Sequence, residues 1–174
     1  MTENTIVSNQ HNELHFSYAA EFIEDAEDLF IEAKDALFDI NNWAQAAGLK
    51  GINFTLTDAH KKEVHRTAHT GDHISIEKDK VTYWLHVDIV EYDDYPDENK
   101  ESFMICIKPL GSQNDNIICL SIERINTRLF AYLNYVEANA IDLIDNQSPM
   151  TENTIPILSH IEWSALLKRF ISFE

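Results

Sequence analysis

The sequence predicts an α+β fold in which one antiparallel β-sheet meander packs on an N-terminal helical segment and a C-terminal helix. Three observations carry this prediction. Apolar residues recur at helical spacing between residues 26 and 44, alternate with polar residues in six segments between residues 52 and 135, and return to helical spacing near the C-terminus. Consecutive strands with short connections usually pair antiparallel, so the middle of the chain is expected to form a meander.

The N-terminal helical segment is indicated by apolar residues with acidic residues between them. The apolar residues are Ala26, Leu29, Phe30, Ala33, Leu37, Ile40 and Ala44. This spacing places them on one face of a helix. Glu24 and Asp25 precede the pattern, where carboxylates favour a helix N-terminus. Asn41 and Asn42 permit a break, and Gly48 is a suitable C-terminal stop.

The strands are predicted from alternation with a period of two. A first strand lies before the helix, in the segment ELHFSYAAEF, with Phe16, Tyr18 and Ala20 on one face. The six later segments have apolar faces at Ile52, Phe54 and Leu56; Ile74 and Ile76; Val81, Tyr83, Leu85, Val87 and Ile89; Phe103, Ile105 and Ile107; Ile118, Leu120 and Ile122; and Leu129, Ala131, Leu133 and Tyr135. Because a slip of one residue would turn every core side chain toward water, these faces also predict register.

Register can be proposed for two hairpins. Pairing Ile107 with Ile118 closes the first one and places Cys106 opposite Cys119 on the other face of the sheet. The second hairpin is closed by pairing residue 122 with residue 129, which predicts a tight turn at residues 125 and 126. Isoleucine at position 125 suits a turn with positive φ badly.

A second helix is predicted at the C-terminus. Its apolar stripe consists of Trp163, Leu166, Leu167, Phe170 and Ile171. Before it, the segment IDLIDNQSPMTENTIP predicts a connecting loop, because Pro149 and Pro156 limit regular structure. With 174 residues, the chain is expected to form a single domain over residues 1–174, with a flexible tail at residues 1–12.

The composition excludes several classes of partner. A formal net charge of −17 repels phosphate backbones and anionic lipid, so neither nucleic acid nor a membrane is an expected partner. The N-terminus lacks the pattern of a signal peptide, and no apolar run approaches membrane-spanning length, so the protein is expected in the cytoplasm. Cys106 and Cys119 are the only cysteines and are expected to be reduced thiols.

Four histidines fall in the segment TDAHKKEVHRTAHTGDHISI, at positions 60, 65, 69 and 73. Three of them have the spacing of four residues that metal-binding pairs use on a helix. However, as a helix the segment would lack an apolar face, and it lies between two runs with strand periodicity. We therefore expect exposed histidines in a polar turn region and no metal.

Other candidate chemistry is sparse. The acidic run EYDDYPDENKE lacks the order of an EF-hand loop and is expected to be a solvated hairpin loop. His86 and Asp88 on one strand have the geometry for a general acid–base pair, pointing away from the main apolar face. There is no glycine-rich phosphate loop and no nucleophile elbow, so neither a catalytic residue nor a cofactor is predicted.

The second face of the predicted sheet carries Trp84, His86, Met104, Cys106, Cys119, Phe130 and Tyr132. A fully solvated face would be richer in Lys, Glu and Thr, so part of this face is expected to be covered. A homodimer through the face that carries Trp84, Cys106, Cys119 and Tyr132 would cover it. A folded-over chain segment or another partner would serve equally.

The order of elements resembles the START / polyketide-cyclase-like (SRPBCC) superfamily. The resemblance is carried by HFSYAAEFIEDAEDLF leading into ALFDINNW, followed by GDHISI and VTYWLHVDIVEY. It implies a helix-grip fold, in which a curved sheet wraps a long C-terminal helix and the cavity between them often holds an apolar small molecule or lipid. The last helix here is expected to be shorter than the family's. The superfamily has no universal catalytic residue to carry over.

The leading functional hypothesis is a non-enzymatic protein that binds an apolar small molecule or lipid between the sheet and the C-terminal helix. The predicted ligand-binding residues are Tyr83, Leu85, Leu133, Tyr135, Trp163 and Phe170. The same residues would also serve as ordinary core. The alternative is an acidic protein-interaction module, such as an inhibitor or immunity-type protein, without a ligand cavity. An enzyme that acts on a small apolar substrate ranks third.

Overall fold

A computed structural model describes residues 14–110, 117–136 and 157–173. The elements are β1 (Leu14–Ala19), α1 (Ile23–Phe38), the 3₁₀ turn η1 (Ile40–Asn42), α2 (Trp43–Ala47), β2 (Ile52–Thr57), β3 (His73–Lys78), β4 (Val81–Tyr95), the 3₁₀ turn η2 (Pro96–Glu98), β5 (Lys100–Pro109), β6 (Ile117–Ile125), β7 (Arg128–Val136) and α3 (His160–Phe170). The predicted tail at 1–12 and the whole of the predicted loop at 141–156 lie outside the described residues.

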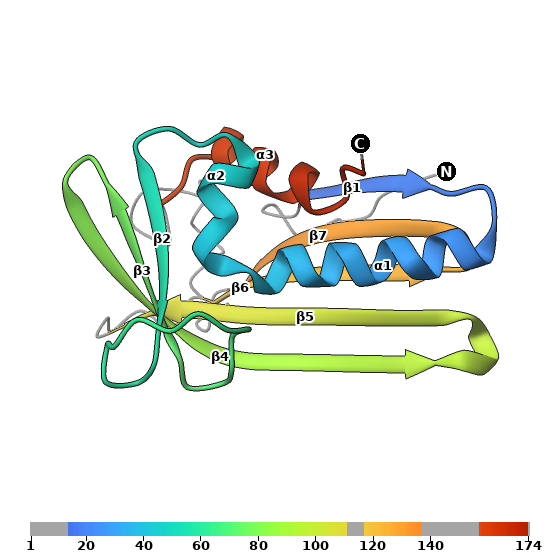
Figure 1. Ribbon diagram of the computed structural model, residues 1–174, viewed down its shortest axis with the longest axis horizontal. Helices are drawn as coiled ribbons and strands as arrows, with labels where there is room; N and C mark the ends of the chain where they lie inside the picture. Colours follow the sequence, from blue (N-terminus) through green and yellow to red (C-terminus); the bar gives the residue numbers. More distant parts are fainter. Residues whose placement is uncertain (1–13, 111–116, 137–156, 174) are drawn as a thin grey trace, which may run out of the picture.

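The strands form one antiparallel sheet in the order β1-β7-β6-β5-β4-β3-β2, which curls around the helices (Figure 1). Helix α1 lies against β6, and α3 packs on α2, β7 and β1. This architecture confirms the predicted fold class, including its helix-grip arrangement. The inward side chains that the alternation predicted between Ile52 and Tyr135 are at most 5% exposed, except at Val81, Tyr83, Ile89 and Phe103.

The predicted N-terminal helical segment is confirmed, together with its break. Helix α1 buries Ala26, Phe30, Ala33 and Leu37 at the expected spacing of three or four residues. The chain then passes through η1 into the short helix α2. Helix α2 ends at Gly48, whose φ of 71° lies in the left-handed region that favours glycine.

Strand β4 contains a β-bulge that the alternation did not predict. Val87 pairs with residue 107 and Ile89 pairs with residue 106, so Asp88 has no partner residue on β5. The extra residue reverses the alternation along the second half of the strand. Ile89 was predicted to face inward and instead faces outward at 40% exposure, while Val90 packs against the core.

The two predicted hairpin registers have different outcomes. The pairing of Ile107 with Ile118 is confirmed. In the second hairpin Ile122 pairs with residue 131, so the predicted pairing with residue 129 is wrong by two residues. The turn therefore lies at residues 126 and 127. Asn126 takes a φ of 55°, which asparagine tolerates better than the isoleucine of the predicted turn.

The expectation of two reduced thiols is wrong. Cys106 and Cys119 pair across β5 and β6 as the register predicted, with their Cα atoms 4.0 Å apart, and their sulfurs form a disulfide. Composition could not reveal this bond, because two cysteines without a motif are typical of reduced proteins. The relevant signal was the predicted register, which placed the two side chains directly opposite one another.

Candidate functional site

The structure brings five of the six predicted ligand-binding residues into one buried cluster. These are Leu85, Leu133, Tyr135, Trp163 and Phe170, which come from β4, β7 and α3. Tyr83 is not part of the cluster. It pairs with Ile76 on β3 and is 37% exposed. The interior between the sheet and α3 is therefore apolar over the positions that the sequence selected.

Trp163 brings a hydrogen-bond donor into this interior. The side chain is 1% exposed, and its indole Nε1 has no hydrogen-bond partner in the described part of the chain. Trp43 meets the usual requirement, because its Nε1 donates to the carbonyl of Leu37 over 3.0 Å. An unpaired buried donor costs about 1–3 kcal/mol. The N–H of Trp163 is thus a hydrogen-bond donor that the described residues leave without an acceptor.

The position of Trp163 is fixed by the start of α3. Ser159 and Glu162 form a capping box, in which the Ser159 hydroxyl accepts from the Glu162 amide and the Glu162 carboxylate accepts from the Ser159 amide. Lys78 from β3 donates to the same carboxylate and to the carbonyl of Ile157. Burial acts to raise the pKa of Glu162, but the Ser159 amide and Lys78 outweigh it and lower that pKa.

A groove between α2 and α3 lies at one edge of the predicted site. Its volume is about 140 Å³. It is lined by Ala36, Asp39, Asn42, Trp43, Ala46, Leu166, Arg169 and Phe170. A dry engineered cavity of about 150 Å³ holds benzene, whereas pockets for drug-sized ligands exceed about 300 Å³. The groove has room for one small ring.

The four clustered histidines lie in and directly after one connection between strands. His60, His65 and His69 lie in the connection between β2 and β3, and His73 begins β3. Among the residues that the structure describes, no three His, Cys, Asp or Glu side chains are arranged to hold a metal ion.

His73 instead faces His86 across β3 and β4, with ring centroids 5.6 Å apart. The Nδ1 atoms of both rings are buried without a hydrogen bond among the described residues. Burial lowers the pKa of His73, and the neighbouring His86 and Lys61 lower it further. The predicted acid–base pair is loose, because His86 Nδ1 lies 3.8 Å from the Asp88 carboxylate.

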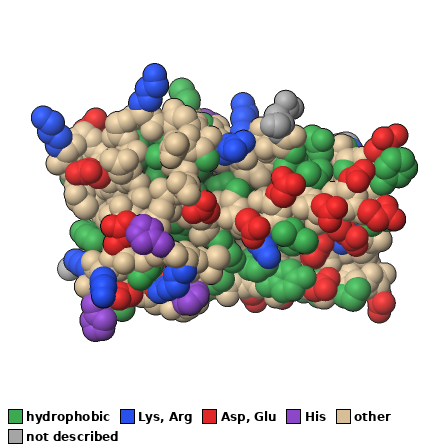
Figure 2. Space-filling view, viewed as in Figure 1, with side chains coloured by type: hydrophobic (Ala, Val, Ile, Leu, Met, Phe, Trp, Pro, Cys, Tyr) green, Lys and Arg blue, Asp and Glu red, His purple; other side chains and the backbone are tan. Residues whose placement is uncertain are grey.

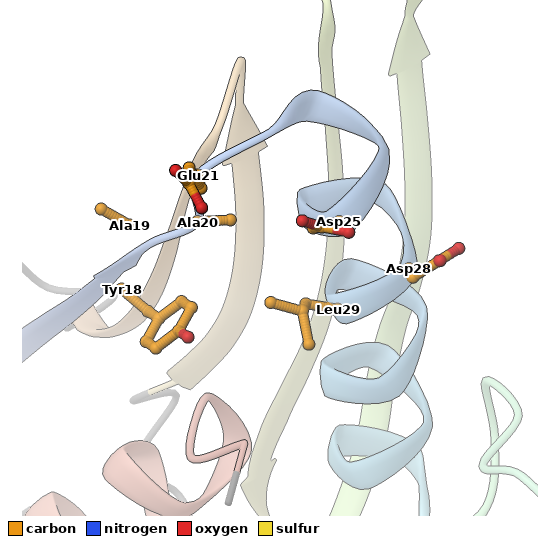
Figure 3. A pocket seen from close by; sticks show the side chains of 7 residues that line it. All are labelled: Tyr18, Ala19, Ala20, Glu21, Asp25, Asp28 and Leu29. Carbon is orange, nitrogen blue, oxygen red and sulfur yellow. The ribbon is translucent and has the colours of Figure 1, made fainter.

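Two hollows lie at the opposite end of the molecule. The first, with a volume of about 480 Å³, opens between the end of β1 and the start of α1, where Tyr18 and Leu29 point toward one another and Asp28 points away (Figure 3). The second, of about 330 Å³, contains Arg124, which is 4% exposed. Sequence reasoning missed Arg124. Its signal was a charged residue two positions after Ile122, in the inward-facing series of β6.

The comparisons with known proteins give a likeness of fold. No family model and no curated protein matches the chain. A hypothetical protein from Helicobacter pylori, jhp0584, is 11% identical, with a TM-score of 0.52 over 98% of this chain and 96% of its own. The protein Ara h 8.0201 is 7% identical over 92% of this chain and 95% of its own, with a TM-score of 0.44.

Norcoclaurine synthase from Thalictrum flavum is also 7% identical, over 92% of this chain and 91% of its own, with a TM-score of 0.43. The first likeness indicates a common overall fold, and nothing about this chain follows from the two scores below 0.5. Membership of the START-like superfamily therefore stays a prediction. No helix in the described ranges is both long and apolar enough to cross a membrane.

Proposed function

We propose that the protein is a non-enzymatic binding protein for an apolar small molecule that carries one hydrogen-bond acceptor, held between the sheet and α3. The observation that carries this proposal is the buried indole N–H of Trp163, which lacks an acceptor in the described part of the chain. The surrounding cluster includes Leu85, Leu133 and Phe170, which would contact the apolar body of the ligand.

The chemistry of the interior defines the ligand class. Apolar walls exclude a charged ligand, since burying an unpaired charge is costly. A carbonyl or ether oxygen that accepts from Trp163 Nε1 would remove the cost of the unpaired donor. One such bond contributes about 1 kcal/mol, or roughly fivefold in affinity. The small groove beside Phe170 suggests that one aromatic ring is a suitable probe size.

Two probes of the same shape test the proposal. Acetophenone carries a carbonyl acceptor, and ethylbenzene lacks one. In an NMR titration we expect acetophenone to shift the indole Nε1–H resonance of Trp163 and to bind roughly fivefold more tightly than ethylbenzene. In the variant Trp163→Phe, which removes the donor, the two probes are expected to bind equally. Trp84→Phe, on the outer face, is the matched control and should retain the preference.

Two results would contradict the proposal. One is that neither probe binds the intact protein. The other is that the preference for acetophenone persists after Trp163→Phe, because the acceptor would then be recognised elsewhere.

We also propose that the protein is located in the cytoplasm. The oxidation state of its two cysteines tests this location. Reducing compartments keep cysteine thiols unpaired, whereas the structure contains the Cys106–Cys119 disulfide. Rapid alkylation of intact cells followed by mass spectrometry of this peptide pair measures the fraction that is reduced. A mainly oxidised pair would contradict a cytoplasmic location.

A further inference from the structure

Three segments that are distant in sequence meet at the hollow around Arg124. Helix α1 contributes Glu27 and Ile31, the tip of the β4–β5 hairpin contributes Asp94 and Pro96, and β6 contributes the arginine. The hollow has a volume of about 330 Å³. In the space-filling view, acidic side chains gather at this end of the molecule, where α1 begins and the hairpin turns (Figure 2). The volume is sufficient for a long side chain.

Arg124 forms the floor of the hollow and is held on two sides. Its Nε donates to Glu101 over 2.7 Å, and one amino group (NH1) donates to the Asn99 side chain over 2.8 Å and to the Asn126 carbonyl over 2.9 Å. The other amino group (NH2) makes no hydrogen bond within the described ranges. Its ion-pair neighbour is the Glu27 carboxylate, 3.9 Å away at the rim. The Arg124 side chain is 5% exposed, and its NH2 group has two N–H donors that make no hydrogen bond among the described residues.

The hollow also has an excess of negative charge. Three carboxylates, those of Glu27, Asp94 and Glu101, line it beside the single guanidinium. Glu101 is 15% exposed and pairs directly with Arg124, so the two charges of that buried pair compensate one another. Glu27 reaches the same guanidinium only at 3.9 Å, and Asp94 has no ion-pair partner among the described residues. The rim therefore keeps an excess of negative charge, which would attract a cation.

The walls between these carboxylates are apolar. Ile31 lies on the solvent side of α1 and is 51% exposed. Pro96 lies in the same lining, at the start of η2. Long basic side chains place their methylene groups along such apolar surface while the charged end meets carboxylates. The hollow thus combines an apolar wall, two acceptor groups for a cation and one donor group for a carbonyl.

We propose that this hollow binds a lysine or arginine residue of a partner peptide. The basic end of the side chain pairs with Glu27 and Asp94, its methylene stem packs on Ile31 and Pro96, and the carbonyl oxygen of the same residue accepts a hydrogen bond from the NH2 group of Arg124. The excess of acidic residues over the whole chain steers such a partner toward this surface. The inference is independent of ligand binding beneath α3.

The proposal is tested with N-acetyl-L-lysine methylamide, a minimal lysine residue with both peptide carbonyls. In an NMR titration of the full chain, the amides of residues 27–31, 94–99 and 124 should shift and saturate. N-acetyl-L-norleucine methylamide lacks the ammonium group, and n-pentylamine lacks the carbonyl. Each should bind at least about tenfold more weakly, because each loses one charge-assisted contact.

A pair of charge-matched variants locates the site. Glu27→Gln with Asp94→Asn should weaken binding of the lysine probe at least about tenfold. Glu32→Gln with Glu77→Gln removes the same charge from exposed positions outside the hollow and should change affinity less than about twofold. Both double variants should bind acetophenone as the unaltered protein does, which separates this site from the interior one.

Three outcomes would overturn the proposal. The first is the absence of saturable shifts with the lysine probe at 10 mM, a concentration about tenfold above a 1 mM dissociation constant. The second is an equal loss of affinity in the two double variants, which would indicate attraction to the overall charge only. The third is equal binding of the lysine and pentylamine probes, which would remove the role of Arg124.

Discussion

Two short arginine–carboxylate pairs in the described part of the chain differ in which partner is more deeply buried. In the connection between β2 and β3, Arg66 is 35% exposed and Asp72 is 6% exposed, with 2.7 Å between their closest atoms. In the hollow at the acidic end, Arg124 is 5% exposed and Glu101 is 15% exposed, again with 2.7 Å between them. The two pairs have the same closest distance. They differ in how many hydrogen bonds the more buried side chain of each pair makes.

Both carboxylate oxygens of the buried Asp72 accept hydrogen bonds from its own loop. The carboxylate accepts two hydrogen bonds from Arg66 and a third from the amide of His69. The buried guanidinium of Arg124 keeps one amino group without a hydrogen bond in the described part of the chain, beside a hollow. The pair of Arg66 and Asp72 therefore stabilises the connection between β2 and β3. The pair of Arg124 and Glu101 joins two turns and keeps N–H donors that a ligand could use. A buried ion pair is a candidate site when its donors exceed the acceptors around it.

The largest effect is expected at the arginine of the second pair. Arg124→Met leaves Glu101 buried without its guanidinium partner and removes the bonds to Asn99 and Asn126. Breaking a buried pair in this way costs about 3–5 kcal/mol in the free energy of unfolding, measured by urea denaturation. The double variant Arg124→Met with Glu101→Gln should recover much of the loss. A loss below about 1 kcal/mol for the single variant would show that the pair is effectively solvated.

Asp72→Asn should have a smaller effect, because Arg66 is already partly in solvent. The amide keeps one acceptor oxygen but loses the charge and the two-pronged geometry that the guanidinium requires. We expect a loss of about 1.5–3 kcal/mol by the same measurement. If Asp72→Asn destabilised the protein more than Arg124→Met, the ranking of the two pairs would be reversed.

Asp72 should also make the free energy of unfolding depend on pH. Burial acts to raise the Asp72 pKa, but the hydrogen bonds from Arg66 and His69 outweigh it and hold the pKa below the ordinary 3.8. The folded state therefore releases this proton more readily than the unfolded state. Its stabilisation is fully present above the ordinary value and is lost as pH falls through the lower folded value. Urea denaturation between pH 6 and pH 3 should show a steeper loss in the unaltered protein than in Asp72→Asn.

The smallest effect is expected at an exposed pair in the same connection. His65 and Glu63 lie 3.2 Å apart, with side chains 76% and 57% exposed. Glu63→Gln should change the free energy of unfolding by less than about 0.5 kcal/mol, because solvent screens such pairs. A loss as large as that of Asp72→Asn would mean that proximity matters more than burial in this connection.

The sequence was sufficient for the parts of the fold that depend on apolar periodicity. The stripe that ends at Phe170, the face from Ile52 to Leu56 and the pairing of Ile107 with Ile118 all follow from the burial of one face, which tolerates no slip. The bulge at Asp88 could not be predicted in this way, since a bulge adds one residue without changing the apolar content.

The candidate sites were less predictable, because each depends on what a polar group does or does not contact. The apolar stripe of α3 indicated that Trp163 is buried. That its Nε1 lacks an acceptor among the described residues could not be predicted, because this depends on where the neighbouring elements lie. Arg124 had a sequence signal, a charge in an inward-facing series. Its partners Glu101, Asn99 and Asn126 lie on another strand and in two turns, so only the folded chain brings them together.

The bulge at Asp88 in β4 determines which side chains at the hairpin tip face the helices. Before Asp88 the odd-numbered side chains of β4 face the helices, and after it the even-numbered ones do, including Asp94 at the rim of the hollow. If Asp88 instead paired like its neighbours, the regular alternation would carry Asp94 to the convex side and bring Tyr95 inward, without altering any residue of the tip itself. Which side chains of the hairpin tip line the hollow beside Arg124 thus depends on one residue that is left unpaired, six positions earlier in the same strand.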